Sequence, residues 1–436
     1  MVTETQFVAA RSDGRRVTRG GPGLVLALAC IAQAMVGLDT AIVNVALPSI
    51  QRDLEVGRST LQWVVVAYGL LLGGFLLFGG RLTDHFGRRH MLVAGLVIFT
   101  GASLLAGAAD DARVLIAARA IQGFGAALTA PAALSLVAVT FPEGRERNRA
   151  LAVFGAVGGV AGTLGVVASG LLTAGPGWRW AFFINVPTGV VLIAAATAFL
   201  VPDRPRDRTT RLDLAGATTV TGGLLLSVYT LHYAATHGWI TGATLAMLCG
   251  AVVLMAVFAR IEARSADPLV PGSLLKNRTL VAANLTAFLA FSALLAFIFI
   301  GSLLMQQALG YSPMKTGLAW MATTGTLFVT AMIGGRLVAR IGVSHLLIAG
   351  LLFVTVGALL LTRVPAHASY LADLLPAFLF AGVGFGLCGP ALQIGALSGV
   401  AKPAAGLASG LVETMREIGG AVGVARQEQS VDRDTG

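Results

Sequence analysis

The chain has 436 residues, of which 56% are hydrophobic and 12% are charged. A soluble domain carries about 25% charged residues, so a soluble globular fold and a disordered chain are both excluded. Cys30, Cys249 and Cys388 all lie in apolar runs, which argues against a disulfide scaffold or a cysteine metal site. The net charge is +10. Because the basic residues lie between apolar runs, we interpret them as determinants of membrane orientation rather than of nucleic-acid binding.

Apolar segments long enough to cross a bilayer, about 20 residues each, follow one another along the chain. The sequence predicts spans near 24–48, 61–79, 91–109, 114–140, 150–173, 181–201, 213–234, 241–259, 280–304, 314–334, 344–362 and 370–392, and a weaker one at 405–425. Residues 1–23 are polar and basic and lack a cleavage-type site, so they are expected to be a cytoplasmic tail. An all-α, multi-pass membrane protein is therefore predicted.

The distribution of lysine and arginine predicts the orientation. With a cytoplasmic N-terminus, 21 basic residues fall in inside segments and 6 in outside segments. Cytoplasmic loops carry the excess of positive charge, so the N-terminus is predicted to be cytoplasmic. With an odd number of spans, the C-terminus is then expected on the outer side. The protein is expected to lie in the cytoplasmic (inner) membrane.

An internal repeat is visible in two loop segments. Residues 79–92 and 334–347 match at seven of fourteen positions, at an offset of 255 residues. The same offset roughly aligns the first span with the ninth. The sequence therefore predicts two parallel six-helix repeats with a two-helix insert between them, which is a transporter architecture.

The repeat also predicts the domain organisation: a tail at 1–23, a six-helix bundle at 24–201, an insert with its flanking loops at 202–279, a five-helix bundle at 280–425 and a polar tail at 426–436. The offset puts a final helix near 436–456, so the second bundle is expected to be incomplete. Either the chain is a truncated product, or this helix is dispensable.

Four segments carry a family resemblance: residues 38–48, 80–89, 119–127 and 178–187. Together they resemble the motifs of the major facilitator superfamily, and within it the fourteen-helix drug:proton antiporters, over about residues 24–425. The resemblance implies a two-bundle transporter that couples proton entry to multidrug efflux and so to antibiotic resistance.

The expected partners are an amphipathic substrate, cationic compounds included, together with protons and the lipid bilayer. No nucleic acid, cofactor or metal is expected, and the chain is expected to be a monomer. A phosphate-binding loop and a catalytic constellation are both missing from the sequence, so an enzyme is not predicted. Two alternatives stay open: a proton-coupled uptake permease of the same fold, and an inactive or regulatory remnant.

Asp39 and Arg119 are predicted to form the proton-coupling site. Asp39 lies about 13 Å and Arg119 about 7.5 Å below the outer end of its span, at 1.5 Å per residue. Gln122 lies on the same face as Arg119 and could bridge the remaining distance. A carboxylate within a span usually faces a pathway or relay, and the resemblance points to the same positions. The alternative is a static ion pair that only fixes packing.

Residues 79–92 predict a conformational latch between helices. Gly80 and Gly87 allow a sharp turn and close approach, while Asp84 can pair with Arg88 or cap a neighbouring helix. Arg88 and Arg89 are placed as positive-inside anchors, and a purely topological role for them is the alternative.

Candidates for the substrate cavity are Asn44, Phe288, Phe291 and Glu413. Glu413 is either a functional carboxylate or part of a compensated polar stripe with Arg416 and Glu417. The small number of acidic residues in the spans predicts that aromatic side chains and cavity shape determine selectivity.

Overall fold

The structure, a computed structural model, describes residues 18, 20–201, 214–265, 276–311, 313–365, 368–400 and 404–434. Apart from one bridge between Thr18 and Leu200, the regular structure of these residues is helical. Most of the predicted N-terminal tail lies outside the described residues, as do 202–213 and 266–275 at the ends of the predicted insert.

The helices of the first half coincide with the first six predicted spans. They are α2 (Pro22–Asp53), α3 (Arg58–Phe86), α4 (Arg88–Gly107), α5 (Ala112–Thr140), α6 (Arg145–Ala174), α7 (Trp180–Phe183) and α8 (Asn185–Phe199). The sixth span consists of α7 and α8, which are separated by Ile184 alone; the backbone of Ile184 is itself helical, so Trp180–Phe199 forms one span.

The remaining helices also follow the predicted order. They are α9 (Leu214–His237), α10 (Gly242–Glu262), α12 (Arg278–Leu303), α13 (Pro313–Leu361), α14 (Leu375–Leu397) and α15 (Ala405–Asp434), with short π-helical turns η1 (Leu304–Ala308) and η2 (Tyr370–Leu374). The predicted polar tail is helical as far as Asp434, because α15 continues through it.

α13 contains two predicted spans joined at Gly342. Its backbone there has φ 81° and ψ 165°, which is not helical. The equivalent residue of the first repeat, Gly87, has φ 96° and ψ 147° and separates α3 from α4. Glycine adopts positive φ without steric cost, so both halves turn at the same position of the repeat with nearly the same backbone.

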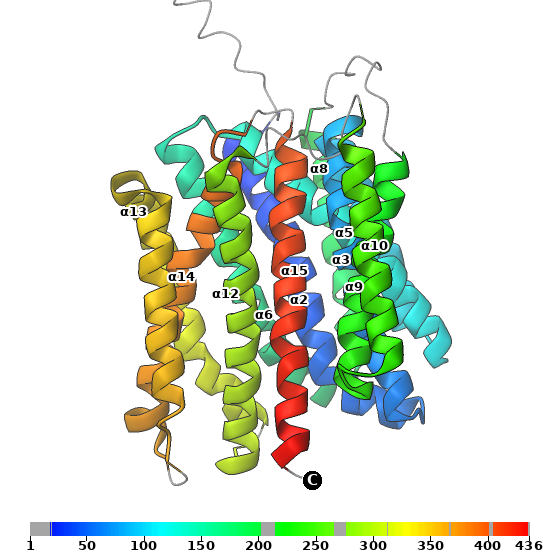
Figure 1. Ribbon diagram of the computed structural model, residues 1–436, viewed down its shortest axis with the longest axis vertical. Coiled ribbons are helices and arrows are strands. Elements are labelled where there is room, and N and C mark those ends of the chain that lie inside the picture. The colour runs from blue at the N-terminus through cyan, green and yellow to red at the C-terminus, as the bar shows by residue number, and fades with distance from the viewer. Residues whose placement is uncertain are drawn as a thin grey trace, which may run out of the picture.

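The long helices run side by side along the long axis of the molecule (Figure 1). Within the described residues, nine helices are long and apolar enough to cross a membrane, and one of these, Lys315–Leu361, is the joined pair of α13. α2 begins and α15 ends at opposite ends of the bundle (Figure 1). We call the end at which α2 begins, and at which Gly87 and Gly342 lie, the basic end.

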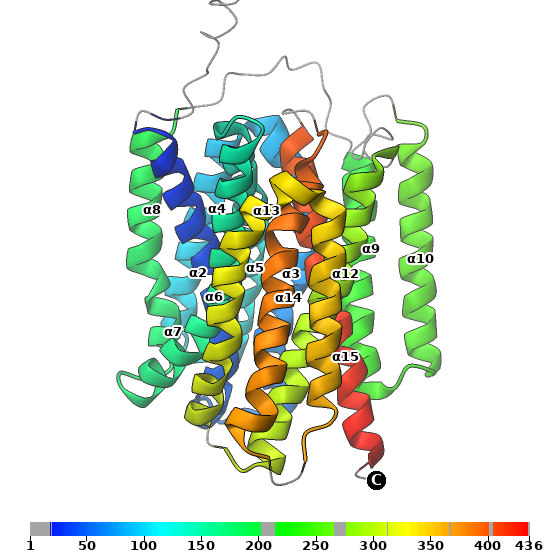
Figure 2. The same cartoon turned by 90° about the vertical axis from the view of Figure 1, so that its left-hand side faces the viewer.

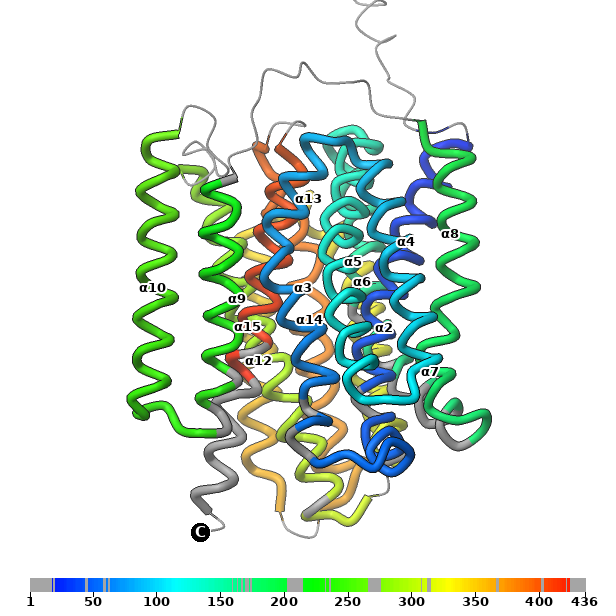
Figure 3. Tube along the Cα trace, turned by 90° about the vertical axis from the view of Figure 1, so that its right-hand side faces the viewer, coloured from blue at the N-terminus to red at the C-terminus, as the bar shows by residue number. Residues whose placement is uncertain are grey.

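The first half consists of α2–α8 and the second of α12–α15. They meet where α3 packs on α15 and where α6 packs on α13 and α14. The inserted helices α9 and α10 pack on each other, and α9 also contacts α3 and α15. α10 lies outermost at one edge, with α8 at the other (Figures 2 and 3). The predicted two-bundle architecture with a two-helix insert is confirmed.

Among the described residues, the two halves share an apolar core at the basic end. There, one cluster joins buried residues such as Leu77 and Leu134 of the first half to Leu397 and Leu407 of the second. Towards the opposite end, the described core residues form separate clusters in the first half, around Phe182, and in the second half. The two halves are therefore closed on each other at the basic end.

Candidate functional site

Asp39 of α2 lies at the centre of a buried hydrogen-bond network. Its carboxylate pairs with the Nη1 of Arg119 at 2.6 Å, and its other oxygen accepts from the amide of Gln122 at 2.7 Å and from that of Asn185 at 2.8 Å. Asp39 is 0% exposed and Arg119 is 1% exposed. One carboxylate thus joins α2, α5 and α8 inside the first half.

The partners of Asp39 extend the network to two more helices. Arg119 donates from Nε to the carbonyl of Val64 on α3 at 3.0 Å, and its guanidinium lies 4.1 Å from the ring centre of Tyr68. Gln122 donates to Ser103 of α4 at 2.9 Å and accepts from Arg119 at 2.7 Å. Five helices therefore contribute to one polar cluster.

A buried ion pair is costly unless further hydrogen bonds satisfy both charges. Here both carboxylate oxygens have partners. Besides Asp39, Arg119 has two further acceptors: its Nε donates to the carbonyl of Val64 and its Nη1 donates to the side-chain oxygen of Gln122. Removing either charge would leave the other buried and uncompensated. Asp39 is thus linked, directly or through one neighbouring side chain, to all five helices of the cluster.

The structure brings together Asp39, Arg119 and Gln122 as the sequence predicts. Although Asp39 and Arg119 are expected at different depths in their spans, their side chains are in direct contact. Sequence reasoning missed Asn185 and Ser103. Asn185 lies within the family-like segment 178–187, which was a usable signal. Ser103 carried none, because a lone serine in a span gives no indication of its neighbour.

Asp84, the predicted latch residue, joins the two halves. One carboxylate oxygen accepts from the backbone N–H of Gly406 at 2.9 Å, and the other accepts from that of Leu407 at 2.8 Å. These N–H groups belong to the first turn of α15, where helix N–H groups lack intrahelical partners. Asp84 is buried, and it caps a helix 322 residues away. The predicted cap on a neighbouring helix is therefore present in the structure.

The helices at this cap are in direct backbone contact. A Cβ on Gly80 would lie 2.5 Å from the carbonyl oxygen of Gly406 and 3.2 Å from the Cα of Gly410. No side chain fits there, so α3 and α15 touch through glycines. Of the predicted anchors, Arg88 donates to Ser135 at 3.1 Å and Arg89 donates to the carbonyl of Thr197 at 2.7 Å.

A second buried charge pair lies in the other half. Nη1 of Arg416 on α15 is 2.6 Å and 2.8 Å from the two carboxylate oxygens of Glu413, and Gln393 of α14 donates to Glu413 at 3.4 Å. The guanidinium of Arg416 lies 4.1 Å from the ring centre of Phe291. Glu413 is thus paired with Arg416.

A cavity of about 50 Å³ adjoins this pair, between α12, α13, α14 and α15 and the middle of α6. Phe291, Phe385, Gln393 and Arg416 are among its lining residues. Within the part of the chain that the structure describes, the Oε1 of Gln393 and the Nε of Arg416 are buried without a hydrogen-bond partner. An apolar cavity with one unused acceptor and one unused donor suits a small amphipathic group or ordered water.

Of the four predicted cavity residues, Phe291 lines this cavity, and Glu413 adjoins it through Arg416 without being part of the lining. Phe288 of α12 packs against α15, where its backbone contacts Gly419, and it does not line the cavity. The side chain of Asn44 lies outside the described part of the chain.

Residues 29–424 match the family model of the Major Facilitator Superfamily. The chain is 40% identical to the puromycin resistance protein of Streptomyces alboniger, over 92% of the chain and 80% of that protein. It is 37% identical to the cephamycin export protein of Amycolatopsis lactamdurans, over 97% and 87%. It is also 34% identical to a multidrug resistance protein of Mycobacterium tuberculosis, over 90% and 72%.

Two solved structures share the fold. One is a proton:xylose symporter bound to 6-bromo-6-deoxy-D-glucose, with a TM-score of 0.66 at 17% identity, covering 95% of this chain and 90% of that one. The other is a human organic anion transporter, with a TM-score of 0.67 at 16% identity, covering 95% and 93%.

Two helical bundles that enclose buried charge networks and meet at one end define a membrane transporter. The chain belongs to the major facilitator superfamily, a family of transporters rather than enzymes. The resemblance inferred from the sequence motifs is confirmed.

Proposed function

We propose that the chain is a proton-coupled exporter of amphipathic antibiotics or drugs across the cell membrane, with its N-terminus and basic end on the cytoplasmic side. The relatives are named for antibiotic resistance, multidrug resistance and export, which supports export over uptake. The excess of lysine and arginine in the predicted inside segments supports the orientation. Proton coupling is proposed because the buried carboxylate of Asp39 accepts hydrogen bonds from three side chains, those of Arg119, Gln122 and Asn185.

Protonation of Asp39 changes what its carboxylate can accept. As an anion it accepts from Arg119, Gln122 and Asn185 at once. A proton occupies one acceptor position and removes the charge that Arg119 requires. The neutral form therefore favours a different arrangement of α2, α5 and α8, which is the property that a coupling carboxylate needs.

α3 can carry this rearrangement to the other half. In its first half it contacts Arg119 through Val64 and Tyr68, and at its basic end Asp84 caps α15. A continuous helix from Arg58 to Phe86 joins the two contacts. A shift of α3 on proton binding would thus weaken the closure at the basic end. Spatial continuity supports this route, and the latch variants described below test it.

The cavity beside Arg416 is the proposed substrate region. Its aromatic lining suits the apolar part of a drug, and the unused polar atoms of Gln393 and Arg416 suit a polar substituent. In the structure the halves are closed at the basic end, and their cores separate towards the opposite end. Expansion of this cavity from the separated side would release substrate outward.

The test uses membrane vesicles with an imposed proton gradient, with ethidium and puromycin as amphipathic probes. Wild-type protein should build a substrate gradient that collapses with an uncoupler, whereas an inactive remnant would build none. Asp39→Asn should lose uphill transport when it is compared with wild type at matched amounts of folded protein. Asp111→Asn, an exposed carboxylate of the same half, is the matched control and should behave as wild type.

If Asp39→Asn still builds a gradient that an uncoupler abolishes, Asp39 is not the coupling residue, and Glu413 becomes the next candidate. Accumulation in the direction opposite to export would favour the uptake permease.

A further inference from the structure

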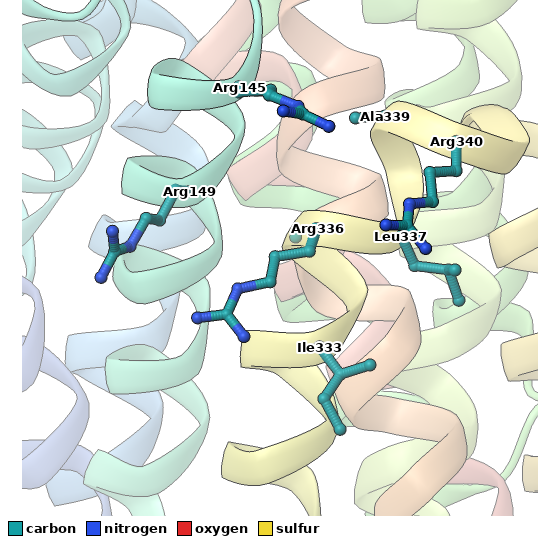
Figure 4. Close-up of a pocket in the computed structure, with 8 residues that line it drawn as sticks. Arg145, Arg149, Ile333, Arg336, Leu337, Ala339 and Arg340 are labelled. Carbon is teal, nitrogen blue, oxygen red and sulfur yellow. The ribbon is translucent and has the colours of Figure 1, made fainter.

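A basic cavity of about 420 Å³ lies at the basic end, between the two halves. Arg145 and Arg149 of α6 line it from the first half, and Arg336 and Arg340 of α13 line it from the second. Figure 4 shows Arg145 extending from α6 towards α13 and Arg336 extending from α13 towards α6. Two arginines from each half thus border one space.

The positive charge of this cavity is uncompensated. Within the part of the chain that the structure describes, the lining has no acidic side chain, and no salt bridge or side-chain hydrogen bond involves these four arginines. Glu146 follows Arg145 in sequence but does not line the cavity. Arginine favours phosphate through paired, charge-assisted hydrogen bonds, so the complement of this cavity is a phosphate-bearing anion.

The rest of the lining is apolar and is partly exposed on the outer surface of the helices. Ile333, one turn from Arg336 towards the membrane centre, is 50% exposed, and Leu337 lies beside the arginines. A free phosphate ion has no apolar group that could pack against Ile333 and Leu337. A glycerophospholipid matches both parts, because its phosphate can meet the guanidinium groups while its glycerol and acyl groups lie along Ile333. Basic pockets between membrane helices on the cytoplasmic side bind anionic headgroups in this way.

We propose that this cavity binds the headgroup of an anionic glycerophospholipid, which bridges the two halves at the basic end. The bridge adjoins a point of closest contact, because Gly335 of α13, also in the lining, packs directly on Ala152 of α6. A bound headgroup neutralises arginines that otherwise repel one another across this joint. Anionic lipid therefore stabilises the conformation closed at the basic end.

The test measures lipid binding directly, so it does not depend on drug export. Purified full-length protein in a zwitterionic detergent is titrated with dioctanoyl-phosphatidylglycerol, dioctanoyl-phosphatidylcholine or inorganic phosphate, and bound lipid is counted by native mass spectrometry. Arg145→Gln/Arg336→Gln removes one arginine from each half. Arg260→Gln/Arg264→Gln is the control, because it also removes two exposed arginines at the basic end, but from the inserted helix α10 and the residues after it.

We expect saturable phosphatidylglycerol binding to wild type and control, and binding at least about tenfold weaker in the cavity variant. Phosphatidylcholine and inorganic phosphate should bind far more weakly. Equal loss in both double variants would overturn the proposal in favour of diffuse surface charge, and phosphate competing as well as the lipid would overturn it in favour of a free-anion site.

Arg145→Lys/Arg336→Lys keeps the charge but not the paired donors. It should retain part of the binding, and its thermal unfolding provides a check on folding. Full binding by the glutamine variant at an unchanged melting temperature would refute the site outright.

Discussion

Replacing Asp84 by asparagine should open the basic end of the transporter. Asp84 uses both carboxylate oxygens, one for the N–H of Gly406 and one for the N–H of Leu407. Asparagine has one acceptor oxygen, so its NH₂ group would face the second N–H. One buried donor then loses its charged partner, which costs about 1.5–3 kcal/mol. The ratio of closed to open molecules should fall roughly 10- to 150-fold.

Asp111→Asn is a matched control within one half. Asp111 also caps a helix, but it is exposed and accepts from a single N–H, that of Arg113, at 3.2 Å. Asparagine and aspartate are equivalent at such a cap, so this variant should leave the closed population unchanged. If Asp84→Asn opens the basic end and Asp111→Asn does not, the effect comes from losing the two-oxygen cap between the halves. Loss of a carboxylate at a helix cap would not by itself explain it.

The populations can be measured with spin labels at His90→Cys and His345→Cys, in a background without the native cysteines. These two residues are equivalent in the repeat, exposed, and one lies in each half. Asp84→Asn should move the distance distribution towards longer separations, and Asp111→Asn should not. Identical distributions in both variants at matched expression would refute the latch.

Three further outcomes are expected. Asn185→Leu should lower uphill transport without abolishing it in vesicle assays, because Asp39 keeps its remaining donors while losing a bond of about 1.5–3 kcal/mol. Gly80→Ala should force α3 and α15 apart and reduce both transport and the closed population seen by spin labels. The indole of Trp178, followed by Arg179, holds the pKa of Asp53 below its usual range, so the stabilisation by this carboxylate is present at neutral pH and is lost as the pH falls through that lowered pKa. The difference in melting temperature between wild type and Asp53→Asn should therefore persist to about pH 4 and shrink below it; a difference that already disappears near pH 6 would contradict this assignment.

The spans and the repeat could be predicted from the sequence because membrane insertion depends on local hydropathy. Each predicted span coincides with a helix, and Gly87 and Gly342 turn alike as their equivalent positions require. The pairing of Asp39 with Arg119 was also accessible, because a charge within a span needs a partner.

The remaining contacts depend on how distant helices face each other. The sequence could not give the partner of Asp84, because Gly406 and Leu407 offer only backbone N–H groups, which every residue but proline has. The basic cavity was hidden for a similar reason. Arg145 and Arg336 are positive-inside residues of separate loops, and only the fold places them across one space.

The position of the inserted helices has a consequence for how a lipid-soluble compound reaches the interior. α9 covers the seam between α3 and α15: Trp63 stacks on Tyr229 with ring centres 6.0 Å apart, and a Cβ on Gly74 would clash with Leu225. If the halves part along that seam, the opening meets protein rather than acyl chains. The seam between α6 and α13 has no inserted helix in front of it (Figure 2). A compound that enters laterally from the bilayer would therefore be expected to use the seam between α6 and α13.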